Sequence, residues 1–93
     1  MPKFMIERDI PKAGQFSSAE LQGIAAKSCG VLSEMTRAGT DIQWIHSYVT
    51  ADKIYCVYSA PTEEAVRTHA TRGGFPANRI ERVYGIIDPT TSE

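Results

Sequence analysis

Long apolar runs are missing from this 93-residue chain. Charged residues interrupt the apolar positions of the first segment, Met-Pro-Lys-Phe-Met-Ile-Glu-Arg-Asp, which therefore lacks the roughly 7 to 15 residue apolar region of a signal peptide. We expect a cytoplasmic protein that does not enter a membrane. Cysteine is also scarce, and Cys29 and Cys56 are expected to remain reduced in that compartment.

An excess of basic residues is absent as well. Ten lysines and arginines oppose eleven acidic residues, which gives a net charge of -1. No basic run interleaved with aromatic residues occurs, although that is the pattern of a nucleic-acid surface. We expect no nucleic-acid partner, and the length predicts a single domain.

Several signatures of phosphate and metal sites are missing. Gly73-Gly74 stand where a helix is expected to end, so they do not form a phosphate-binding loop, which opens a helix. Neither His-Glu-x-x-His nor Cys-x-x-Cys occurs, and the chain has only two histidines. A closed zinc site would need both histidines and both cysteines to converge from four different elements.

Four segments have the composition of β-strands. Residues 3–9, 41–49, 53–59 and 80–87 contain β-branched and aromatic residues without a helical stripe. The middle two are separated by only three residues, which predicts a hairpin.

Two capping patterns predict the helices between these strands. Ser17, with Glu20 three residues later, forms a capping box, and the apolar stripe that follows extends to a stop at Gly39. Residues 61–64, Pro-Thr-Glu-Glu, place a capping hydroxyl and two acids at the start of a second helix that runs to about Arg72.

The resulting order, β-α-β-β-α-β, predicts an α+β fold of the ferredoxin-like type. In this sandwich a four-stranded antiparallel sheet carries both helices on one face. Residues 1–88 form the predicted domain and residues 89–93 a polar C-terminal tail. The uncovered face would expose an apolar patch, so we expect a homodimer of the dimeric α/β-barrel kind. A monomer with a sufficiently polar open face is the alternative, and strand alternation does not separate the two.

The strand around His46 is the first candidate site. Trp44, His46 and Tyr48 have the same parity, together with Ile42, and are expected to share one face of the sheet. On the open face they would line a ligand site with a titratable group. Alternatively, His46 packs between aromatic rings with its nitrogens satisfied by polar neighbours.

His69 is the second candidate. It follows Ala65 by four residues and Val66 by three, so helical spacing turns it toward the sheet. There it either fastens the helix by a hydrogen bond or binds a ligand or metal. Cys56 is either a core residue or a ligand, and Glu7 either offers a carboxylate to a site or is a solvated or paired charge.

Short motifs follow one another from Asp52 to Ile80. They are Tyr55-Cys56, Ala60-Pro61, Glu64-Ala65 with His69, and Gly74-Phe75-Pro76-Ala77. With Phe4-Met5 near the start, their order and spacing resemble a family of small bacterial domains known as nickel-binding-protein-like. The resemblance covers most of the chain and is densest in the third strand and second helix.

This resemblance implies a ferredoxin-like fold, a homodimer and, in one branch, nickel bound through histidine-rich positions. Nickel-binding members carry more histidines, including one at or near Phe75, whereas this chain has His46 and His69 alone. Nickel accepts imidazole and carboxylate ligands, so two histidines with Glu7 and water would complete a set.

Three functions follow. The leading hypothesis is a dimeric ligand- or metal-binding protein, possible metals being nickel or another divalent transition metal. The alternative is a cofactor-free enzyme, such as an isomerase or monooxygenase, with an apolar pocket and His46 as acid or base. The third is an interaction module whose sheet face only dimerises. The predicted metal ligands are His46, His69, Cys56 and Glu7, and the predicted ligand-binding residues are Trp44, His46, Tyr48, Tyr55 and Tyr58.

Overall fold

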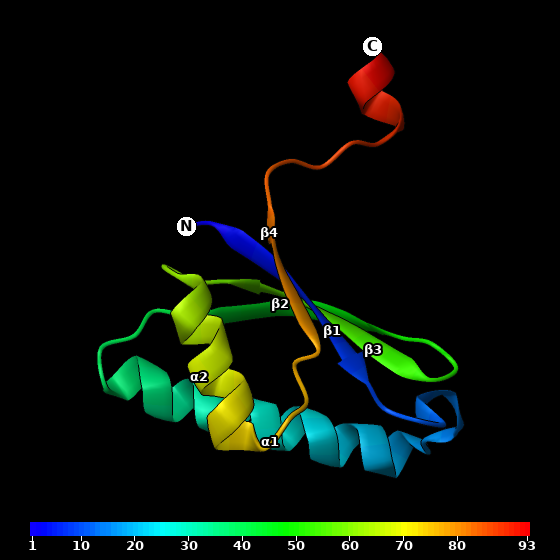
Figure 1. The fold of residues 1–93 in the computed structure, drawn as a ribbon, viewed down its shortest axis with the longest axis vertical. Coiled ribbons are helices and arrows are strands. Elements are labelled where there is room, and N and C mark those ends of the chain that lie inside the picture. The colour runs from blue at the N-terminus through cyan, green and yellow to red at the C-terminus, as the bar shows by residue number, and fades with distance from the viewer.

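Backbone pairing joins four strands into one antiparallel sheet in the computed structural model, which describes residues 1–93 (Figure 1). The strand order is β2-β3-β1-β4, so the two central strands are β3 and β1. This arrangement confirms the predicted ferredoxin-like α+β fold. The strands are β1 Lys3–Asp9, β2 Gln43–Val49, β3 Lys53–Ser59 and β4 Arg79–Val83.

Helices α1 (Ser18–Arg37) and α2 (Glu63–Gly73) both cover the same face of the sheet (Figure 1). The predicted capping box opens α1: the Ser17 hydroxyl accepts from the Glu20 amide at 3.1 Å, and the Glu20 carboxylate accepts from the Ser17 amide at 3.0 Å. The Thr62 hydroxyl accepts from the Ala65 amide at 3.2 Å and caps α2. These contacts satisfy backbone donors that a helix start leaves free.

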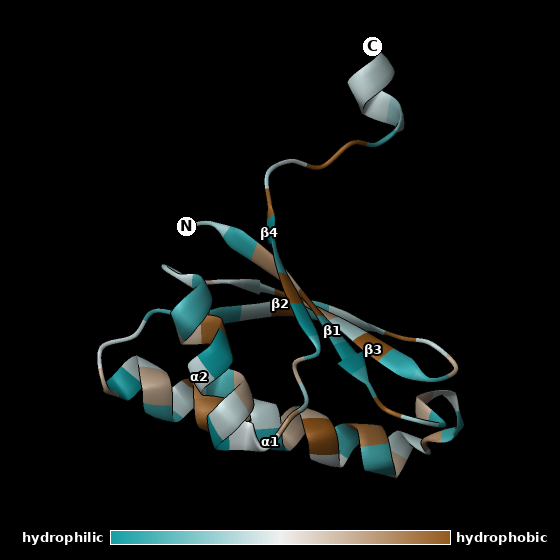
Figure 2. Ribbon diagram, viewed as in Figure 1, coloured by the Kyte–Doolittle hydropathy of each residue, from teal (hydrophilic) through white to brown (hydrophobic).

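The hydrophobic core lies between the sheet and the helices, and Figure 2 shows apolar segments on the strands and on α1. Alternate residues of β1 and β3 point into this layer, including Phe4 and Ile6 of β1, while α2 contributes the fully buried Val66. The opposite, open face carries no helix. Neither helix of the protein is long and apolar enough to cross a membrane.

A β-bulge at Ile45 changes the predicted face of several β2 residues. Trp44 is opposite the buried Tyr58, but the next pair along the ladder is His46 with Val57. The extra residue moves His46 to the open face while Trp44 stays on the helix side. The prediction that Trp44, His46 and Tyr48 share one face is therefore wrong.

The last strand is shorter than predicted, because β4 ends at Val83 rather than at residue 87. Val83 pairs with Lys3, the first residue of β1, so the residues after it have no strand to pair with. An arm continues from β4 away from the body of the domain to a short 3-10 turn at Pro89–Ser92 (Figure 1). Its apolar side chains Tyr84, Ile86 and Ile87 are each more than 70% exposed.

Candidate functional site: an apolar cavity beneath α1

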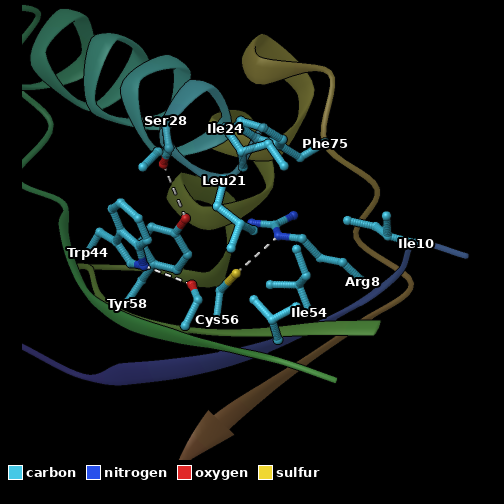
Figure 3. Close-up of a pocket in the computed structure, with 13 residues that line it drawn as sticks. Arg8, Ile10, Leu21, Ile24, Ser28, Trp44, Ile54, Cys56, Tyr58 and Phe75 are labelled. Carbon is cyan, nitrogen blue, oxygen red and sulfur yellow. Dashed lines mark hydrogen bonds between the residues drawn. The ribbon is translucent and has the colours of Figure 1, made fainter. Parts of the chain in front are cut away.

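A cavity of about 240 Å³ lies between α1 and the helix-facing side of the sheet (Figure 3). Ten of its thirteen lining residues are hydrophobic. Because a cavity of roughly 150 Å³ accommodates benzene, this one has room for about ten non-hydrogen atoms. Its main apolar walls are Leu21, Ile24 and Ala25 of α1, Trp44 of β2, Ile54 of β3 and Phe75 after α2.

The residues of α1 explain why the cavity is open. Two of the α1 residues that line the cavity, Ala25 and Ser28, have small side chains. Trp44 and Tyr58 form the facing wall. A larger residue at either helix position would occupy the space, because protein interiors otherwise pack at the density of organic crystals.

The polar feature of the cavity is Arg8, which is only 3% exposed. Its Nε donates to Cys56 Sγ at 3.3 Å, and its Nη1 donates to the Pro76 carbonyl oxygen at 2.6 Å. Nη2 is buried and has no hydrogen-bond partner. No carboxylate lies within 4.0 Å of this guanidinium, since the salt bridges of the chain involve only Lys53, Arg67 and Arg79 as cations. Burying an uncompensated charge costs on the order of several kcal/mol.

The alternation of buried and exposed residues along β1 indicates that the Arg8 side chain is buried. Arg8 has the parity of Phe4 and Ile6, so it belongs to the buried face, whereas Glu7 and Asp9 have the other parity. A charged residue in register with a buried apolar row is an unusual position. Arg8 is not among the site residues predicted from the sequence, although its parity in β1 is the signal that could have identified it.

A buried polar cluster joins the two helices to the sheet beside the cavity. Ser28 Oγ lies 3.1 Å from His69 Nε2 and 3.5 Å from the Tyr58 hydroxyl. His69 is completely buried, and its ring stacks on Phe75 with the centroids 5.6 Å apart. Burial, together with the charge of Arg8, lowers the pKa of His69 to about 4, and burial raises the pKa of Tyr58. The imidazole of His69 is therefore neutral at neutral pH.

The predicted ligand-binding residues divide between the two faces of the sheet. Trp44 and Tyr58 line the cavity. Tyr48 and Tyr55 are paired across β2 and β3 on the open face, where the His46 ring meets the Tyr48 ring edge-on at 4.9 Å between centroids. The five residues do not surround one site, because the bulge in β2 places its aromatic residues on opposite sides.

The predicted metal ligands are divided in the same way. Cys56 and His69 are buried on the helix side, whereas Glu7 and His46 lie on the open face. Glu7 there accepts from Lys53 Nζ at 3.2 Å. No three histidine, cysteine or acidic side chains of the chain gather closely enough to hold a metal ion. The sheet keeps the two pairs apart within one subunit.

Comparison with known proteins gives the family. A solved structure from Streptomyces coelicolor A3(2), titled as the crystal structure analysis of SCO4226, superposes with a TM-score of 0.75 at 20% sequence identity, covering 91% of this chain and 99% of that one. At that identity the likeness establishes the fold. No curated protein matches the chain. The family model described as nickel responsive protein SCO4226-like matches residues 4–83. The chain therefore belongs to the SCO4226-like family of nickel responsive proteins.

Proposed function

We propose that the protein is a homodimeric small-molecule-binding protein whose site is the cavity beneath α1. The observation that carries this proposal is the apolar space of about 240 Å³ between α1 and the sheet. Close-packed interiors contain few voids larger than a water molecule, and apolar cavities with a few polar groups are typical of ligand sites. The single tryptophan of the chain, Trp44, lines the cavity and provides an intrinsic reporter.

A matched pair of helix variants tests the site. Ala25 lines the cavity, whereas its neighbour Ala26 is exposed. We expect Ala25→Phe to fill the cavity and weaken binding of octanamide, a neutral apolar probe of ten non-hydrogen atoms, by at least tenfold. Ala26→Phe adds the same side chain toward solvent and should leave binding unchanged. Quenching or a shift of the Trp44 fluorescence during titration measures both.

Equal octanamide affinity in the two phenylalanine variants would contradict the location of the site. Circular dichroism of both variants confirms that they are folded. Absence of any response in the wild type to octanamide and also to octanoate, each near its solubility limit, would remove the proposal as a whole.

The apolar surfaces outside the core support the homodimer. Met5 and Tyr48 lie on the open face and are 40% and 58% exposed. The arm after β4 exposes the apolar side chains of Tyr84, Ile86 and Ile87. Part of this arm is coloured as hydrophobic in Figure 2. Large exposed apolar patches mark interaction sites in soluble proteins. A second copy that packs face to face on the sheet would cover Met5 and Tyr48.

The name of the family suggests nickel as a ligand. The residues of one subunit do not form a nickel site. The two histidines lie on opposite faces of the sheet, and the His69 ring is fully buried and held by Ser28. His46, by contrast, is exposed. Any nickel contact of this chain would therefore involve His46, with further ligands supplied from outside its own subunit.

Nickel titration separates the two histidines. By calorimetry we expect only weak nickel binding, which His46→Ala removes and His69→Gln leaves unchanged. The reason is that a fully buried imidazole on the helix side cannot share an ion with an exposed one across the sheet. A tight site that is lost in both variants would contradict this separation.

The alternative hypothesis of a cofactor-free enzyme used His46 as the catalytic acid or base, and the position of His46 does not support that role. A general acid or base must lie within hydrogen-bond reach of the reacting group. The walls of the cavity do not include His46, which lies on the far side of the sheet from it. We therefore propose binding, rather than catalysis by His46, for a molecule held beneath α1. The cavity also favours ligand binding over the third hypothesis, an interaction module whose sheet face only dimerises, because such a module has no need of an internal cavity.

A further inference from the structure

We infer that the molecule bound beneath α1 is an apolar acid of about ten non-hydrogen atoms, and that Arg8 recognises its carboxylate. This inference rests on the proposed function, because it names the chemical class of ligand for the same cavity. It comes from the one charged group in the wall and from the character of the walls around it.

Arg8 is held in place by neutral partners, and its Nη2 amino group is still unused. The Cys56 sulfur and the Pro76 carbonyl fix two of its nitrogens, at 3.3 and 2.6 Å. Phe75 packs against the guanidinium at 5.4 Å from ring centroid to Cζ. Nη2 remains buried without a partner. The geometry of the side chain is therefore set before any ligand enters, and both N–H groups of Nη2 remain without a protein partner.

The charge in the cavity favours an anion. Arg8 is the only lysine, arginine, aspartate or glutamate among the thirteen lining residues, so no acidic side chain would repel a carboxylate. His69, which lies next to Phe75, is neutral at neutral pH and adds no second positive charge. A single carboxylate would compensate a single guanidinium, and charge-assisted hydrogen bonds of this pair are about twice as strong as neutral ones.

The remaining walls favour an apolar body. Of the two serines that line the cavity, Ser47 accepts from Trp44 Nε1 at 2.9 Å and Ser28 is engaged with His69 at 3.1 Å. Their hydrogen bonds within the protein leave little polar surface for a second polar group of the ligand. Figure 3 shows Leu21 and Ile24 above the space and Ile54 below it. An aliphatic chain or an aromatic ring would pack against these side chains.

Octanoate and octanamide form a pair of probes that tests the charge alone, since both contain ten non-hydrogen atoms and differ at the head group. Titration of each at pH 7.5, followed by Trp44 fluorescence, is expected to show octanoate binding at least tenfold more tightly. In Arg8→Met this preference should disappear. Arg67→Met, which removes an exposed arginine of α2, should keep it.

Two outcomes separate the inference from the proposed function. Equal affinity for octanoate and octanamide, with both blocked by Ala25→Phe, would overturn the inference and leave the cavity as a neutral apolar site. No binding of either probe would overturn both. The comparison of the two probes on the wild-type protein does not depend on how Arg8→Met folds. Arg8→Lys, which keeps the positive charge, supplies a second variant and should retain the preference for octanoate.

Discussion

Glutamate in place of Val57 is expected to convert the proposed homodimer to a monomer. Val57 lies on β3 between Met5 of β1 and His46 of β2, near the middle of the open face. In a face-to-face dimer both copies would bury the new carboxylate, and an uncompensated buried charge costs on the order of several kcal/mol. The dimer dissociation constant should rise by about a thousandfold or more, since each ~1.4 kcal/mol is tenfold.

Sedimentation equilibrium measures this change directly. The wild-type protein should sediment at twice the 10.2 kDa of one chain, and Val57→Glu at the mass of one chain. Thr71→Glu adds the same charge to an exposed position of α2 and should remain dimeric. A wild-type protein that is monomeric at micromolar concentration, or a Val57→Glu variant that is still dimeric, would show that the open face is not the interface.

Acid should destabilise the protein through His69. Burial and the nearby Arg8 lower the pKa of His69 from 6.5 to about 4, so the unfolded state binds this proton at a higher pH than the folded state does. The contribution is fully present above pH 6.5 and is lost as the pH falls toward 4. It amounts to on the order of 3 kcal/mol, since one pKa unit corresponds to ~1.36 kcal/mol.

Urea unfolding at a series of pH values between 4 and 7 measures this loss. His69→Gln replaces the imidazole with a side chain that does not titrate, and should flatten the pH dependence within that window. His46→Gln removes the exposed histidine and should keep the dependence seen in the wild type. If both variants retained the full wild-type slope, His69 would not be the group that responds to acid.

The order of elements could be predicted from local signals alone. The capping residues Ser17 and Thr62 and the short 50–52 turn act within a few residues of sequence, so each marks its helix start or hairpin without reference to the rest of the chain. The end of β4 could not be predicted in this way. It depends on where the partner strand β1 begins, at Lys3, some eighty residues earlier.

The candidate site was harder to predict because it depends on side-chain direction. A bulge adds one residue to one strand, and no residue pattern around Ile45 predicts it. His46 and Tyr48 were therefore assigned to the same face as Trp44, whereas they lie on the opposite one. The cavity itself arises from small residues of α1 opposite large ones of β2 and β3. Such a match between distant segments is visible only once the elements are packed.

Arg8 is an intermediate case. Its parity within β1 is a sequence signal, and it correctly indicates burial. The sequence does not indicate which groups Arg8 contacts. Its partners are neutral, the Cys56 sulfur and the Pro76 carbonyl, and they lie 48 and 68 residues away in the chain. A charged residue on the apolar side of a strand therefore identifies a position of interest but not the chemistry of its partner.

The central claim is that this protein binds its ligand beneath α1 rather than at the histidine on the open face. An amide and indole NMR titration with octanoate tests it most directly. We predict that the signals of Ala25, Ser28 and the Trp44 indole shift together with one affinity, while those of His46, Tyr48 and Tyr55 remain in place. Shifts confined to the open-face residues, with α1 and Trp44 unaffected, would contradict the claim.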